Sequence, residues 1–127
     1  MQKLHDFIQQ HSFATLISHD GSEAVVSHLP ILLDRDTPPY GRLIGHMARA
    51  NSQWKHADGQ RVLVVFRGPH AYISPTWYNA VNVVPTWNYV TVHAHGIFRL
   101  EDDLDRLRDI VGQYVTFYEA EMPDPWS

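Results

Sequence analysis

The segment RVLVVFRG, residues 61–68, contains a continuous apolar run, Val62 to Phe66, between Arg61 and Gly68. An apolar run of this length without alternation is typical of a strand that is buried on both faces. We therefore predict a central β-strand here, and we place the rest of the fold around it.

The segments on either side of this run also have strand patterns. Asn88 to Leu100 alternates apolar and polar residues, and Gly96 within it predicts a bulge or a close backbone approach. Upstream, Phe13 to Ser18 and Glu23 to Leu33 flank an Asp-Gly pair, which favours a hairpin turn. Arg42 to Met47 is the next predicted strand. Because Pro30 has no N–H to donate, we expect it at a bulge or an edge.

Three segments are predicted to be helical. Lys3 to His11 has apolar residues at helical spacing, and Ala48 to Ala57 indicates a short helix or helical turn. Glu101 to Glu121 is the strongest helix, with an acidic first turn that suits the helix dipole. Its apolar stripe contains Leu104, Leu107, Val111, Tyr114, Val115 and Tyr118. The stretch Gly68 to Trp87 is rich in aromatic residues and prolines, and we expect a long, structured loop there.

Composition predicts one globular domain, mainly β with flanking helices. Of the 127 residues, 44% are hydrophobic and 19% charged, and the net charge is −4. This acidic balance argues against a broad nucleic-acid-binding surface, which needs clustered Lys and Arg. There is no cysteine, and no apolar run approaches the ~20 residues that span a bilayer. We therefore expect a cytoplasmic protein without disulfides.

Metal and nucleophile chemistry find little support in the sequence. His93 and His95 share a strand face, but Arg99 stands where a further ligand would be expected. Ser18, Ser27 and Ser74 lack the context of an activated nucleophile. We therefore predict no bound metal and name no catalytic residue.

Two segments suit a planar, anionic ligand. Ile44 to Lys55 joins a strand to a helical turn, where backbone N–H groups and cations would suit a phosphate; its polar residues are His46, Arg49, Asn51, Ser52 and Lys55. Tyr72, Trp77 and Trp87 offer flat surfaces for a fused ring. The alternatives are a surface turn with incidental charge for the first segment, and core filling or dimer contacts for the second.

Five segments together resemble the PaiB-type family of FMN-binding negative transcriptional regulators. They are SHLP at Ser27 to Pro30, GHMARANSQW at Gly45 to Trp54, VVFRGPHAYISPTWY at Val64 to Tyr78, VPTWNY at Val84 to Tyr89 and VHAHG at Val92 to Gly96. The resemblance covers nearly the whole chain. It implies an FMN-binding split β-barrel, related to pyridoxamine-phosphate oxidase, that forms a homodimer with two FMN sites at the subunit interface.

The resemblance also implies a set of FMN contacts. His28 and Leu29 would lie beside the flavin ring, and Trp87 to Thr91 would reach a site from the partner subunit. The phosphate would be held by the turn from Gly45 to Lys55, which includes His46, Arg49, Asn51, Trp54 and Lys55. We add Tyr72 to this set because of its flat aromatic surface. The oxidases use an arginine- and lysine-rich clamp with a different spacing.

The predicted function is that of an FMN-binding, dimeric, cytoplasmic regulatory module over residues 1–127. Family members usually continue past a PDPWS-like segment, so we expect a C-terminal extension to be absent from this chain. A flavin-dependent oxidoreductase using the same pocket and a cofactor-free interaction domain are the alternatives. Direct DNA binding by an acidic chain without a helix-turn-helix is not expected.

Overall fold

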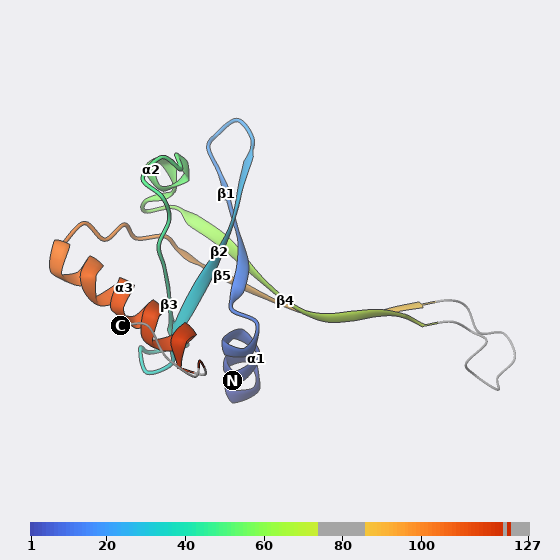
Figure 1. Ribbon diagram of the computed structural model, residues 1–127. Coiled ribbons are helices and arrows are strands. Elements are labelled where there is room, and N and C mark those ends of the chain that lie inside the picture. The colour runs from blue at the N-terminus through green and yellow to red at the C-terminus, as the bar shows by residue number, and fades with distance from the viewer. Residues whose placement is uncertain (74–85, 121, 123–127) are drawn as a thin grey trace, which may run out of the picture.

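The computed structural model describes residues 1–73, 86–120 and 122. Within these residues, five antiparallel strands form one open sheet in the order β3-β2-β1-β4-β5. The strands are β1 (Phe13–His19), β2 (Ala24–Asp34), β3 (Arg42–Gly45), β4 (Arg61–Ile73) and β5 (Thr86–Ile97), and the helices are α1 (Gln2–Gln10), α2 (Gln53–Ala57) and α3 (Leu104–Glu119). The prediction of a mainly β fold with flanking helices is confirmed, and Figure 1 shows the arrangement.

The hydrophobic core lies on one face of the sheet. It contains Ile8, Ala14, Leu16, Leu29, Ile31, Ala57, Val62, Val64 and Phe66. The prediction that β4 is buried on both faces is only half right, because Leu63 and Val65 are half-buried on the opposite face. That opposite face carries apolar residues, with Phe13, Val26 and Ile97 at least half exposed, beside exposed polar ones such as His93 and His95. The run from Val62 to Phe66 is therefore continuous because this strand places apolar residues on both faces.

Strand β2 changes its partner halfway along its length. Its first part pairs with β1 as far as Phe13 and Pro30, and its second part pairs with β3 from Ile31 and Gly45 onward. Pro30 stands at the point of change, where a missing N–H is tolerated. The prediction for Gly96 was wrong, because this residue pairs regularly with Val62 and a Cβ there would meet open space.

Where the structure describes the predicted loop from Gly68 to Trp87, at residues 68–73 and 86–87, it continues two strands. Strand β4 runs on to Ile73 and β5 begins at Thr86, with one irregularity between Arg67 and His70. Figure 1 shows this hairpin extending well away from the rest of the chain; we call residues 70–73 and 86–89 the arm. The prediction failed because Gly68 and Pro69, taken as loop residues, occupy the irregularity, where no regular ladder donor is needed. Trp77 lies outside the described residues.

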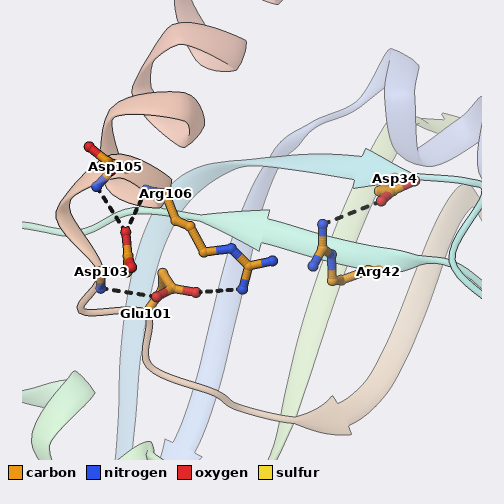
Figure 2. A network of polar contacts seen from close by, with 6 residues as sticks. All are labelled: Asp34, Arg42, Glu101, Asp103, Asp105 and Arg106. Atoms are coloured by element: carbon orange, nitrogen blue, oxygen red, sulfur yellow. Dashed lines mark hydrogen bonds and ion pairs between the residues drawn. The ribbon is translucent and has the colours of Figure 1, made fainter.

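Helix α3 begins later than the sequence indicated. Asp103 caps it, accepting hydrogen bonds from the backbone N–H of Asp105 at 2.9 Å and of Arg106 at 3.2 Å, as Figure 2 shows. Of the predicted apolar stripe, only Tyr114 is buried, whereas Leu104 is 62% exposed. Helical periodicity therefore located the helix, and the stripe includes its packed side, since Leu107 and Val115 are half-buried beside the buried Tyr114.

Candidate functional site

Helix α2 is fixed to the β1–β2 hairpin by a buried glutamine. Gln53 is fully buried, and its Nε2 donates to Ser18 Oγ at 2.9 Å and to the carbonyl of Val25 at 3.0 Å. Ser18 Oγ also bonds His56 Nε2 at 2.8 Å, one helical turn further along. Helix α2, in which the predicted phosphate turn ends, is therefore held by the side chains of Gln53 and His56.

Asn51 holds the middle of this turn. Its Nδ2 donates to Ser27 Oγ at 2.9 Å, which ties the turn to β2, and its Oδ1 accepts the backbone N–H of Gln53 at 2.9 Å. The N–H groups of Asn51 and Lys55 also bond within the turn, to the carbonyls of Ala48 and Ser52. Three of the backbone donors expected for a phosphate are thus already used. The polar side chains of the turn are further donors that a ligand could use.

Two cations stand on this rigid turn. Arg49 and Lys55 are exposed, and neither forms an ion pair within the part of the chain that the structure describes. Trp54 links them: its Nε1 donates to the carbonyl of Arg49 at 3.1 Å, and Lys55 Nζ lies 5.7 Å from its ring centroid. We call Ser27–Pro30 and Gly45–Lys55 together the corner. Its cations fit an anionic group such as a phosphate.

The start of the turn contacts helix α3. The rings of His46 and Tyr114 are 4.4 Å apart in an edge-on arrangement. The Tyr114 hydroxyl donates to the carbonyl of Pro30 and lies 3.1 Å from that of Ile44. Burial raises the pKa of Tyr114 to about 12, and the His46 N–H opposes this shift. Tyr114 is therefore a neutral phenol over the whole physiological range.

The two residues predicted to flank the flavin ring point to opposite faces of β2. His28 is exposed on the open face, where its Nδ1 bonds Thr15 Oγ1 at 3.0 Å. Leu29 is 7% exposed and belongs to the core, as expected for consecutive residues of a strand. Only the side chain of His28 is available to a ligand on the open face.

The remaining predicted contacts lie on or beside the arm, away from α2 and β3 (Figure 1). Trp87 stacks on His70 with ring centroids 5.5 Å apart, and its Nε1 donates to His70 Nδ1 at 3.1 Å. A shallow hollow of 540 Å³ lies beside them. Tyr72 pairs with Trp87 in the sheet and Thr91 with Arg67, and the Tyr72 side chain is outside the description. Within one chain, the structure does not bring these residues to the corner.

Another hollow, of 660 Å³, opens between α1, the end of β2 and α3. It is lined by Gln9, Leu32, Leu33, Arg108, Gln113 and Phe117 among others, none of which was predicted to bind a ligand. Within the described ranges, no three His, Asp or Glu side chains gather as metal ligands. The corner therefore remains the place where the predicted polar residues converge.

Sequence reasoning missed Gln53, Ser27 and Tyr114 as parts of the corner. Gln53 looked like one more polar residue of a surface turn, and nothing in its spacing indicated complete burial. Tyr114 was assigned to an apolar stripe, which gave its ring a packing role but no partner for its hydroxyl. The SHLP segment contained Ser27, but its contact with Asn51 depends on tertiary structure.

Over residues 1–127 the chain matches the family model described as "Putative FMN-binding domain". The chain belongs to this family. It is 40% identical over 96 residues to "Protease synthase and sporulation protein PAI 2" of Bacillus subtilis, covering 75% of this chain and 45% of that protein. The resemblance to the PaiB-type family is thereby confirmed.

Two fungal relatives extend the comparison. An uncharacterised protein of Saccharomyces cerevisiae is 32% identical over 104 residues, covering 77% of this chain and 62% of that protein. An uncharacterised protein of Aspergillus fumigatus is 36% identical over 102 residues, covering 55% of this chain and 39% of that protein. The chain thus spans less than two thirds of the length of these relatives. Among the described residues, no helix has the length and apolarity needed to cross a membrane.

Proposed function

We propose that this chain is the FMN-binding module of a PaiB-like regulator and that it works as a split-barrel homodimer. The corner of each chain would hold the FMN phosphate, with Arg49 and Lys55 as the cations and His46, Asn51 and Trp54 shaping the turn. The ring would lie against the open face near His28. These roles rest on the family membership together with the geometry of the corner.

The observation that carries the proposal is a pair of uncompensated cations on an anchored turn. The chain has a net charge of −4, so it would repel a phosphate, which carries about −1.5 to −2 near neutral pH, unless local donors received it. Arg49 and Lys55 have no ion-pair partner among the described residues. Because Gln53 and Asn51 fix the turn, little conformational entropy would be lost when a ligand binds there.

Dimerisation is supported by the uncovered face of the sheet. Phe13 is 68% exposed, Val26 52% and Ile97 50%, and exposed apolar surface of this kind marks an interaction site. A second copy related by a two-fold axis would cover this face and bring Tyr72 and Trp87 of its arm, with Thr91 beside the arm, to the first copy's flavin ring. Sedimentation at micromolar concentration is expected to give a dimer. A monomer would contradict this part of the proposal.

The regulatory role rests on the PaiB resemblance and does not require this chain to contact DNA. Its arginines and lysines form no basic patch, and Arg106 bonds Glu101 at 3.1 Å among other acidic residues (Figure 2). We expect only non-specific binding of duplex DNA at physiological salt. A sequence-specific gel shift at nanomolar protein would contradict this expectation.

Titration of the wild-type chain with FMN and with riboflavin tests the cofactor assignment. Flavin fluorescence reports binding of both ligands, and riboflavin is the matched control because it lacks only the phosphate. FMN should bind more tightly by about ten- to a hundredfold, the contribution of a charge-assisted hydrogen bond. Absence of FMN binding, or equal affinity for the two flavins, would contradict the proposal.

A further inference from the structure

Where β2 changes its partner strand, the backbone groups of Pro30 and Ile31 have hydrogen-bond partners outside β1 and β3. Pro30 is the last residue of β2 paired with β1, and Ile31 is the first paired with β3. The N–H of Ile31 donates to the carbonyl of Ser12 at 2.8 Å. The carbonyl of Pro30 is bonded instead by a side chain from a distant part of the sequence, the hydroxyl of Tyr114.

Tyr114 reaches both strands at this junction. Its hydroxyl lies 3.1 Å from the carbonyl of Ile44, so the single phenolic proton is placed between an acceptor on β2 and one on β3. A Cβ added to Gly45 would lie 3.5 Å from the same hydroxyl, and the ring packs edge-on against His46. Tyr114 is 7% exposed, so water competes little for these contacts.

The phosphate turn is consequently anchored at both ends by different elements. Its far end is fixed to the β1–β2 hairpin by Asn51 and Gln53. Its near end, at Gly45 and His46, meets Tyr114 of α3. Helix α3 also carries Tyr118, whose hydroxyl bonds Ser12 Oγ at 2.5 Å. Ser12 directly precedes β1, so this contact of Tyr118 does not involve the phosphate turn.

We propose that Tyr114 is a positioning residue for the phosphate end of the flavin site, because it fixes the start of the turn that bears Arg49. That the ligand is a flavin rests on the proposed function, whereas the effect of Tyr114 on the turn does not depend on it. The proposal predicts that the hydroxyl of Tyr114 influences the turn, whereas the hydroxyl of Tyr118, which attaches the same helix, does not.

The test compares Tyr114→Phe with the matched control Tyr118→Phe, since both variants keep the ring and lose one hydroxyl. The first measurement is amide hydrogen exchange without flavin, read at the N–H of Asn51, which bonds the carbonyl of Ala48 at 2.9 Å. Exchange there should become faster in Tyr114→Phe and stay at the wild-type rate in Tyr118→Phe. Equal rates in the two variants would overturn the proposal, whether or not flavin binds.

The second measurement is the ratio of riboflavin to FMN dissociation constants. Tyr114→Phe should lower this ratio by about tenfold, the size of one hydrogen bond, and Tyr118→Phe by less than about twofold. A general loss of stability would weaken both flavins equally and leave the ratio unchanged, which would overturn the role in positioning. If the wild type shows no preference for FMN, the proposed function fails, and the exchange result alone decides the role of Tyr114.

Discussion

The corner and the arm contain the two halves of the predicted ligand set, and they are built differently. At the corner, Gln53, Asn51 and Tyr114 fix the backbone through hydrogen bonds within one chain. On the arm, two strands extend alone, with Trp87 52% and Tyr89 68% exposed. The backbone of the corner is therefore fixed within one chain, whereas these aromatic side chains of the arm are exposed.

The largest expected difference between the two regions is in stability. Replacing Gln53 with Ala removes a fully buried side chain and leaves Ser18 Oγ and the Val25 carbonyl without their donor. We expect the free energy of unfolding to fall by about 2–4 kcal/mol. Trp87→Ala should cost less, about 1 kcal/mol, as expected of exposed cross-strand contacts. Urea unfolding at fixed protein concentration measures both, and equal losses would remove the distinction between corner and arm.

Two glycines of the β4–β5 hairpin sharpen the comparison: Gly68 lies at the base of the arm, and Gly96 pairs with Val62 near the other end of the ladder. A Cβ at Gly68 would lie 2.8 Å from the ring of Phe7, whereas a Cβ at Gly96 would meet nothing within 4 Å. Gly68→Ala should therefore destabilise the protein by about 1–3 kcal/mol through overpacking, and Gly96→Ala should be close to neutral. Thermal unfolding of the two variants checks this. A neutral Gly68→Ala would mean that α1 does not fix the base of the arm.

A smaller effect concerns the pH dependence of the corner. Burial raises the pKa of Tyr114 from 10.0 to about 12 in the folded chain. Between these values the unfolded chain loses the proton and the folded chain keeps it, so stability falls as pH rises through this window and this dependence ends above about 12. Denaturant unfolding at several alkaline pH values should show a shallower fall in Tyr114→Phe than in wild type. Identical slopes would mean that the phenol is not buried in solution.

Strand and helix positions followed from the sequence because they depend on local periodicity. The run from Val62 to Phe66, the Asp-Gly hairpin turn and the helix around Tyr114 were all located from patterns of apolar residues and turn signals. Periodicity failed where tertiary contacts decide. The arm was mistaken for a loop because Gly68 and Pro69 interrupt its pattern, although the ladder resumes at His70.

The charged residues of the candidate site were predictable from the sequence, but the contacts that fix their backbone were not. Arg49 and Lys55 were recognisable because cations next to a helical turn suit a phosphate, and the family resemblance placed the same segment. The burial of Gln53 and the hydroxyl contact of Tyr114 were not recognisable, because each joins residues more than twenty positions apart. Such contacts exist only once the strands have assembled.

The central claim is that the corner receives the phosphate of FMN, and Arg49→Ala tests it most directly. A guanidinium can meet phosphate oxygens in bidentate fashion, whereas Lys55 acts as a point charge. Arg42→Ala is the matched control, since Arg42 lies at the other end of β3 with its Nη2 3.4 Å from Asp34 Oδ2 (Figure 2). Titration of wild type and both variants with FMN and riboflavin, followed by flavin fluorescence, gives the six affinities needed. Arg49→Ala should weaken FMN by about ten- to a hundredfold and leave riboflavin nearly unchanged, while Arg42→Ala alters neither. Equal losses for the two flavins in Arg49→Ala would contradict the placement of the phosphate.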